Sequence, residues 1–319
     1  MIGKLDKIVG KCLLSFLKSK SKAGVVGLEV RADGLSFSLA KPNDEGVLHI
    51  SECVYRECNA AKRSQTLNEL VSEFSLSGMP CRLVLPSDQY KVYPIEKPKV
   101  EENELADAVR WRVKDLLDFD LDDVVIDSYD FPNDALRGRP EQVNVVVSRS
   151  VVIQELVNLV DQSDLELESI DIVDLAVRNI AQRIANDAER AVAILYLRPG
   201  AGMIVLVKGD TVYFSRHFHF SLDALKEPSQ QDSVIQQLSL EIQRSFDYFE
   251  SQLGQVPPRT VSLIGPAPNV PLANMLGGSI AAQVELLDLS SCYGKEHPIA
   301  LAEIHAFAAM GGVIRDGQA

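Results

Sequence analysis

The residues with the clearest potential for chemistry lie in the stretch VVGLEVRADGLSFSLA, which covers residues 25–40. An apolar run reaches a carboxylate, Glu29, and a short polar turn with Arg31 and Gly34 follows before an alternating strand. Tight turns can present backbone N–H groups to an anion, and a nearby carboxylate can hold Mg²⁺, often through water. The stretch therefore predicts a hairpin that could bind the phosphates of a nucleotide.

A second stretch, YLRPGAGMIVL at residues 196–206, has the same rhythm of apolar strand, glycine-containing turn and apolar strand. Gly200 and Gly202 could let backbone N–H groups face an anion, and Arg198 adds a positive charge beside them. This turn contains no carboxylate to hold a metal ion or to orient water for hydrolysis. The two hairpins therefore predict phosphate contacts more readily than phosphate hydrolysis.

The turns depart from what close phosphate binding requires. Val30 stands where glycine would let the backbone approach, and Pro266, after Gly265, removes a backbone donor and fixes φ. Arg31 could compensate by contacting a phosphate directly. We favour the simpler interpretation of Arg31 as a solvated side chain on a strand turn, and we predict no catalytic residue.

Other side chains that could do chemistry are scattered. His217 and His219 share one face of a predicted strand, but no third metal ligand accompanies them. The acidic run at 118–127 lacks the glycine that a calcium loop needs, so a surface loop is expected. The cysteines have no regular spacing, which predicts reduced thiols and no metal site; they are Cys12, Cys53, Cys58, Cys81 and Cys292.

The composition is that of an ordinary globular protein. The chain has 319 residues, which predicts about two domains, and 46% of them are hydrophobic. Its net charge of −13 argues against nucleic acid as a partner, because phosphate backbones require a basic surface. No apolar run is long enough for a membrane span.

Residues 1–22 differ in charge from the rest of the chain. Six lysines and one aspartate give this segment a net charge of +5, and its apolar residues recur at helical spacing. Such a basic amphipathic helix could lie on an anionic membrane surface. The alternative is a helix packed on its own domain or a frayed terminus.

The order of the predicted elements indicates a duplication. Three strands, a helix and a strand fill residues 24–86, and the rhythm of their first part returns from residue 191. Two similar halves with a cleft between them are therefore expected. We predict a basic segment (1–23), a first domain (24–86, 151–190 and 299–319), an inserted strand-helix-strand-strand module (87–150) and a second domain (191–298). The last helix is expected to end at the glycine pair 311–312.

The most specific segments are ENELADAVRWRVKDLL, LEIQRSFDYFESQ and AFAAMGGVIRD. In their order and spacing the chain resembles the actin-like ATPase superfamily, a duplicated ribonuclease-H-like α/β fold. More narrowly it is similar to the PilM-like proteins of type IV pilus assembly, including the MshI-like proteins of mannose-sensitive haemagglutinin (MSHA) pili. The Glu-Ile-x-Arg-Ser core of that family is matched by Glu241, Ile242, Arg244 and Ser245.

This resemblance implies a cytoplasmic scaffold, peripheral on the inner membrane, that docks the tail of a PilN-like bitopic membrane protein. The tail would lie in a groove between the first domain and the inserted module, where Trp111 belongs either to the core or to the groove. Homo-oligomers and membrane contact through residues 1–22 are compatible with this role. A retained nucleotide site, with ATP and Mg²⁺ as ligands, would comprise Glu29, Arg31, Gly34, Arg198, Gly200, Gly202, Glu241, Gly265 and Gly311.

Because all three turns depart from the nucleotide-binding pattern, we predict a scaffold whose ATPase activity is lost or very weak. The alternatives are a working actin-like ATPase, the docking protein of a type II secretion system, and a filament-forming protein of the cell-division type.

Overall fold

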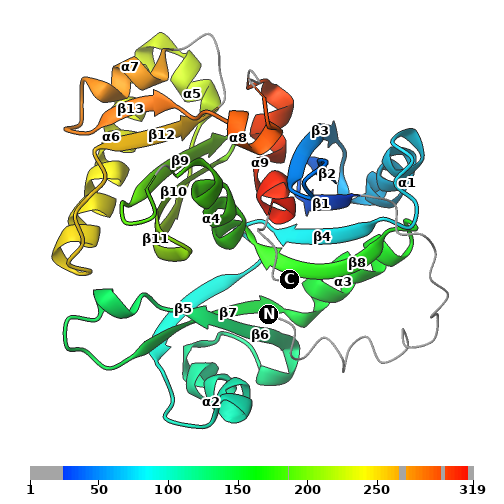
Figure 1. The fold of residues 1–319 in the computed structure, drawn as a ribbon, viewed down its shortest axis with the longest axis horizontal. Coiled ribbons are helices and arrows are strands. Elements are labelled where there is room, and N and C mark those ends of the chain that lie inside the picture. The colour runs from blue at the N-terminus through cyan, green and yellow to red at the C-terminus, as the bar shows by residue number, and fades with distance from the viewer. Residues whose placement is uncertain (1–23, 186, 266–270, 296–298, 315–319) are drawn as a thin grey trace.

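The computed structural model describes residues 24–185, 187–265, 271–295 and 299–314, and it places them around three β-sheets (Figure 1). In the first sheet, β1 pairs antiparallel with β2 and parallel with β4, so that Glu29 lies opposite Ser36. All of β1 is buried, as expected for a central strand of apolar residues. In spatial order the strands are β3 (Leu48–Glu57), β2 (Gly34–Pro42), β1 (Val25–Val30), β4 (Pro80–Leu85) and β8 (Glu166–Ile172).

The second sheet repeats this topology. Its central strand is again antiparallel to one neighbour and parallel to the other. The order is β11 (Thr211–Phe218), β10 (Ala201–Lys208), β9 (Val192–Arg198), β12 (Thr260–Ile264) and β13 (Gln283–Leu286). The predicted duplication is therefore confirmed, and the turns β1–β2 and β9–β10 are equivalent positions in the two halves.

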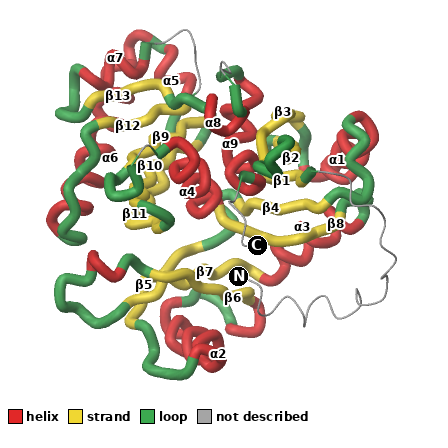
Figure 2. The backbone as a smooth tube through the Cα atoms, in the orientation of Figure 1, coloured by secondary structure: helices red, strands yellow, loops and turns green. Residues whose placement is uncertain are grey.

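Two helices, α4 (Val173–Ile184) and α9 (Leu301–Val313), pack against each other between the two large sheets (Figure 2). A Cβ atom on Gly311 would overlap the carbonyl oxygen of Ala176, so the two helix backbones are in direct contact. The expectation that the last helix ends at Gly311–Gly312 is wrong, because both glycines lie inside α9. They permit the close helix crossing and do not terminate the helix.

The remaining helices pack against the sheets or against other helices. The long helix α6 starts at Pro228, a residue suited to a first helical turn. None of the helices among the described residues is long and apolar enough to span a bilayer. Outside the inserted module, the remaining helices are η2 (Ala60–Lys62), α1 (Arg63–Glu73), α3 (Ser150–Asp161), α5 (Leu222–Lys226), α6 (Pro228–Ser251), α7 (Leu272–Gly277) and α8 (Ser290–Tyr293).

The third sheet belongs to the inserted module, which lies at the bottom of Figure 1. Its order of strand, helix, strand and strand is the predicted one. Val109 and Val113 of the helix pack on Val124, Val143 and Val145 of the sheet, which gives the module a small core of its own. The elements are β5 (Lys91–Glu96), α2 (Glu102–Val113), η3 (Lys114–Leu116), η4 (Leu121–Asp123), β6 (Val124–Asp130), η5 (Asn133–Ala135) and β7 (Gln142–Arg149), with β7 central.

Candidate functional site

Arg31 lies at the centre of the candidate site, in the turn between β1 and β2. Its side chain is only 2% exposed, so the interpretation of Arg31 as a solvated residue is wrong. Nη1 of Arg31 donates to Oε2 of Glu29 at 2.8 Å, and Nε donates to Oδ1 of Asp33 at 3.0 Å. The guanidinium therefore fills the space in front of the Glu29 carboxylate and turns back over its own hairpin.

Helix α9 and strand β3 complete the enclosure of Arg31. Its guanidinium donates to the carbonyl oxygen of His305 at 2.8 Å and to Oγ of Ser36 at 3.0 Å. The ring of Tyr55 stacks on the His305 ring with 4.0 Å between centroids, and Cζ of Arg31 lies 5.0 Å from the Tyr55 centroid. Protein groups thus occupy the space around the arginine that a phosphate contact would need.

The electrostatics of this cluster favour a fixed ion pair. Burial lowers the pKa of Arg31, but the negative charges of Glu29 and Asp33 outweigh it and hold the pKa above its ordinary value. Burial and the Arg31 charge lower the pKa of His305, so its imidazole is neutral at neutral pH. Because arginine can only donate, Nδ1 of His305 must accept from Nη2 of Arg31, at 3.1 Å.

The second hairpin meets the first between the two halves of the fold. Nη2 of Arg198 lies 3.9 Å from Oε1 of Glu29, and this oxygen has no hydrogen-bond partner among the described residues. Gly200 has a left-handed φ of 82°, but its N–H already donates to the Phe220 carbonyl at 3.1 Å. The Gly200 donor is therefore not available to an anion.

Other predicted site residues have local structural partners. A Cβ on Gly202 would overlap the Phe218 ring, and one on Gly34 would overlap the Arg56 carbonyl oxygen. Glu241, on α6, pairs with Arg216 at 3.3 Å. Gly265 follows β12, and a Cβ there would meet Leu197 at 3.3 Å, whereas Pro266, Ala267 and Pro268 lie outside the described residues.

The structure thus brings Glu29, Arg31 and Arg198 together, with Gly34 ending the first turn. It places Gly311 against α4, where packing accounts for the glycine. Sequence reasoning missed His305 and Tyr55. His305 has no local signal, because it is 274 positions from Arg31, and Tyr55 is one of several alternating residues of β3.

The donor set does not fit a magnesium ion. Oε2 of Glu29 already faces Arg31 and Ser36, and Oε1 faces the Arg198 guanidinium. A cation bound to this carboxylate would sit beside two arginine charges, which Coulomb repulsion opposes. Among the residues that the structure describes, no cluster of three His, Cys, Asp or Glu side chains could hold a metal ion.

His217 is held by a buried carboxylate rather than paired with His219. Its Nε2 lies 3.1 Å from Oδ1 of Asp174, whose other oxygen accepts from the Tyr90 hydroxyl. Burial raises the pKa of Asp174, but the hydrogen bond and charge of His217 lower it by more, so the pKa lies below its ordinary value. Ser215 lies 3.5 Å from the same Nε2, so the three residues do not form a hydrolytic triad, which needs both imidazole nitrogens.

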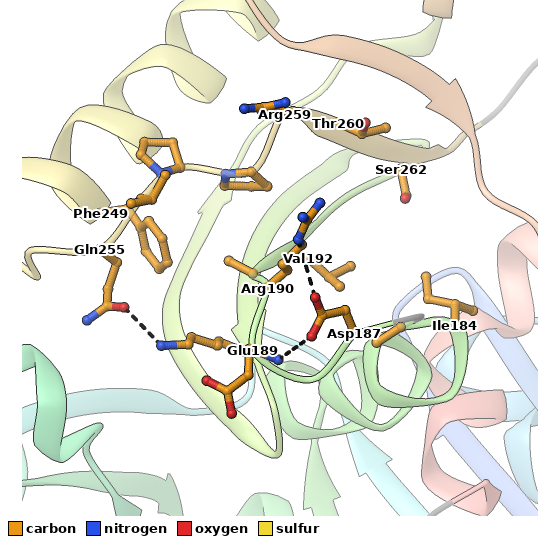
Figure 3. A pocket seen from close by; sticks show the side chains of 16 residues that line it. Ile184, Asp187, Glu189, Arg190, Val192, Phe249, Gln255, Arg259, Thr260 and Ser262 are labelled. Carbon is orange, nitrogen blue, oxygen red and sulfur yellow. Dashed lines mark hydrogen bonds and ion pairs between the residues drawn. The ribbon is translucent and has the colours of Figure 1, made fainter.

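A pocket of about 690 Å³ lies at the end of the second sheet that is opposite the candidate site (Figure 3). It opens where β9 and β12 begin, near Val192 and Thr260, whereas the candidate site lies where β9 ends. Asp187 and Arg190 pair across 3.3 Å at its wall, which leaves the lining nearly balanced in charge. This pocket is therefore separate from the two hairpins.

The inserted module also contacts the second half. We call residues 131–141, between β6 and β7, the strap; it lies below α6 and β11 in Figure 1. Ala135 is 2% exposed within the second domain's core. Oδ1 of Asp134 accepts from the Tyr213 hydroxyl at 2.6 Å, and Arg137 donates to the Ser251 carbonyl at 3.0 Å, at the end of α6. The strap therefore ties the module to the second half of the fold.

Replacing Asp134 by asparagine is expected to lower the free energy of unfolding by about 1 kcal/mol at neutral pH, a small value because the carboxylate is half exposed. Burial raises the pKa of Asp134, but hydrogen bonds from Tyr213 and Lys208 lower it by more, so the pKa lies below its ordinary value. A carboxyl with a depressed folded-state pKa stabilises the fold above its unfolded pKa, near 3.9, and loses this effect as pH falls through the folded pKa.

Urea unfolding at pH 7 and pH 3 should therefore show a difference between wild type and Asp134→Asn that shrinks in acid. Asp210→Asn, in the exposed turn after β10, is the control and should change little at either pH. An equal loss at both pH values would contradict the assigned role of the Asp134 charge.

The comparisons with known proteins bear on the fold. No family model matches the chain, and no curated protein matches it by sequence. Among solved structures, a chain of the PilM–PilN type IV pilus biogenesis complex is similar, with a TM-score of 0.71 and 19% identity over 91% of this chain and 97% of that one.

Two further structures agree on the architecture. The cytoplasmic domain of EpsL, an inner-membrane component of the type II secretion system of Vibrio cholerae, has a TM-score of 0.53 and 11% identity over 92% of this chain and 99% of that one. A protein of unknown function with an actin-like ATPase fold from Bacteroides thetaiotaomicron has a TM-score of 0.50 and 14% identity, over 84% of this chain and 92% of that one. The chain therefore has the duplicated, two-domain actin-like fold.

Proposed function

We propose that this protein is a non-catalytic actin-like scaffold of an MSHA-type type IV pilus assembly machine. It would act in the cytoplasm, peripheral on the inner membrane, and dock the cytoplasmic tail of a PilN-like membrane protein. The likeness to a chain of the PilM–PilN complex supports the choice of machine and partner. The likeness to EpsL favours one alternative, the docking protein of a type II secretion system.

The observation that carries the non-catalytic role is the buried ion pair of Glu29 and Arg31. In an ATPase of this fold, the carboxylate on the first hairpin would be available to a metal–nucleotide complex. Here the carboxylate is neutralised by Arg31 at 2.8 Å and faces Arg198 at 3.9 Å. Binding Mg-ATP there would require breaking a buried ion pair, which costs several kcal/mol.

The docking role is supported by the exposed apolar surface where the module meets the first half. Strand β6 is an edge of the module's sheet, and α3 lies beside it. Val151, at the start of α3, is 52% exposed, and Phe119, before β6, is 37% exposed. Large exposed apolar side chains gathered at one place are typical of a protein-interaction site.

Calorimetric titration with two ligands tests both parts. We expect no heat of binding with Mg-ATP up to about 1 mM, where even a weak site of about −4 kcal/mol would respond. The N-terminal peptide of a PilN-like protein from the same organism should bind, and Val151→Asp should weaken it at least about tenfold, or 1.4 kcal/mol. Val256→Asp, which changes an 84% exposed valine on the second half, should leave binding intact.

Either half of the proposal can fail separately. ATP binding that Glu29→Ala abolishes would restore the nucleotide site and make the protein a nucleotide-dependent switch. Peptide binding that Val256→Asp weakens and Val151→Asp does not would move the partner to the second half. Binding of a secretion-system tail in preference to the pilus tail would select the alternative machine.

A further inference from the structure

The inserted module carries an uncovered surface that combines apolar and acidic side chains. Trp111 is 66% exposed, Leu116 47% and Phe119 37%. Asp115, Asp118 and Asp120 are exposed beside them in the same short stretch of chain. We call these six residues the acidic apolar face. Exposed apolar side chains beside a run of acidic residues favour a partner segment that is apolar and basic.

The negative charge of this face is only partly offset by basic neighbours, because Lys114 lies 5.6 Å from the Trp111 ring centroid and Arg149 lies over the Phe119 ring. Between residues 115 and 130 the sequence has seven aspartates and no lysine or arginine. Lys91 pairs with Asp118 at 3.1 Å across an exposed surface. Asp115 and Asp120 have no ion-pair partner within the described ranges. The face therefore retains charge that an oppositely charged segment could pair with.

An acidic track connects this face with the start of the described chain. No lysine or arginine occurs between residues 150 and 177, and the exposed acids along α3 and into β8 are Glu155, Asp161, Asp164, Glu166 and Glu168, of which Glu168 pairs with Arg82 at 2.8 Å. The α3 end of the track meets the face, because Arg149 lies over the Phe119 ring at 5.4 Å.

The other end of the track lies near Gly24. A Cβ on Gly24 would meet the Met79 side chain, and the Met79 carbonyl accepts from the Glu166 N–H at 2.9 Å. The twelve residues of α3 span about 18 Å, since a helix rises about 1.5 Å per residue. As a helix, residues 1–22 would span about 33 Å. That segment can therefore reach the acidic apolar face from Gly24.

We propose that residues 1–22 of this chain dock along α3 onto the acidic apolar face. The segment has the required chemistry, a net charge of +5 and apolar residues at helical spacing, among them Leu5, Val9, Leu13 and Phe16. Tethering gives it an effective concentration of the order of millimolar, so even weak complementarity holds it in place. Amphipathic helices that dock with an apolar face are a recurring recognition mode.

This contact regulates partner docking if the proposed function is correct. The face adjoins Val151, where we place the PilN-like tail, so the chain's own N-terminal segment competes with that tail. Anionic lipid could in turn attract the lysines of residues 1–22 and release the face. The contact itself does not depend on the proposed function, because it rests on charges and exposure within one chain.

Trp111 is the only tryptophan of the chain, so its fluorescence reports on this face alone. The test measures acrylamide quenching of Trp111 in the full chain at low salt. A tail-reversed variant carries Lys4→Glu, Lys7→Glu, Lys11→Glu and Lys18→Glu, and a face-reversed variant carries Asp115→Lys, Asp118→Lys and Asp120→Lys. We expect quenching to rise about twofold in either variant, because contact with the segment covers roughly half of the exposed indole.

The combined variant decides the interpretation. Reversing both charges restores attraction, so quenching should return to the wild-type level, which general loosening of the module would not produce. Salt at about 1 M should raise quenching in the wild type, because it shortens the Debye length to about 3 Å. Equal quenching in all four proteins overturns the proposal.

Protection of Trp111 from acrylamide that grows with protein concentration also overturns the proposal, since the occupant of the face is then a second copy of the chain. The result is separable from the proposed function. Quenching is measured without a partner peptide. A failed peptide titration with a protected Trp111 therefore contradicts only the docking role. An unprotected Trp111 with tight peptide binding contradicts only the contact of residues 1–22 with the acidic apolar face.

Discussion

Arg31→Ala is expected to lower the free energy of unfolding by about 3–5 kcal/mol, the cost typical of removing one partner from a buried ion pair. The variant leaves the Glu29 carboxylate buried, with 0% exposure, and without its 2.8 Å partner. It also removes the donors to Ser36 and to the His305 carbonyl. Urea unfolding followed by circular dichroism measures the loss.

Two further variants test whether the loss arises from the pair itself. Glu29→Gln combined with Arg31→Met removes both charges and should be less destabilising than the sum of the two single changes, because neither charge remains buried alone. Arg56→Ala is the matched control. Arg56 pairs with Glu73 at 3.0 Å on the surface, where both side chains are about half exposed, so a loss below about 1 kcal/mol is expected.

A wild-type-like stability of Arg31→Ala would contradict the view that the hairpin is held by its own charges. It would mean that water or ions replace the guanidinium, and the space between the two hairpins would then have to be regarded as open to nucleotide. The same measurement therefore bears on the non-catalytic role.

The sequence predicts the duplicated fold because the evidence for it is local. Alternating strands such as Gly34–Pro42 and the return of the same rhythm from residue 191 need no knowledge of distant partners. The module's order of elements was likewise predictable. The prolines before α2 and the helical spacing of the apolar residues within α2 are both local features.

The burial of Arg31 could not be predicted in this way. An arginine in a polar turn is normally solvated, and only the approach of α9, with His305, turns the position into an interior one. The strap is a similar case. Nothing local distinguishes Asp134 from the other aspartates of its region, yet Tyr213 and Lys208 from another sheet bind it. Long-range packing decided both positions.

Arg31 and Arg198 also explain how the two hairpins could be held together without a ligand. The two hairpins carry positive charges that converge on the single carboxylate of Glu29 from opposite halves. Both arginines therefore hold the two hairpins together through Glu29.

Gly311→Ala is expected to lower the free energy of unfolding by about 2–3 kcal/mol, the usual cost of overpacking a well-packed core. The new methyl group would overlap the Ala176 carbonyl oxygen, and a backbone atom in α4 cannot rotate away as a side chain could. Helices α4 and α9 would have to separate, which would also break the 2.8 Å hydrogen bond from Asn179 to the Gly311 carbonyl. The overpacking and the lost hydrogen bond act together, and they outweigh the gain of about 1 kcal/mol that alanine brings as a better helix former.

Gly277→Ala is the matched control, because Gly277 also lies in a helix but a Cβ there would meet no atom within 4 Å. It should leave stability unchanged or raise it by up to about 1 kcal/mol. The two variants separate packing from ligand binding at Gly311. Thermal unfolding without nucleotide should already show the loss, whereas a nucleotide-binding glycine would leave the unliganded protein as stable as wild type and change only its response to ATP.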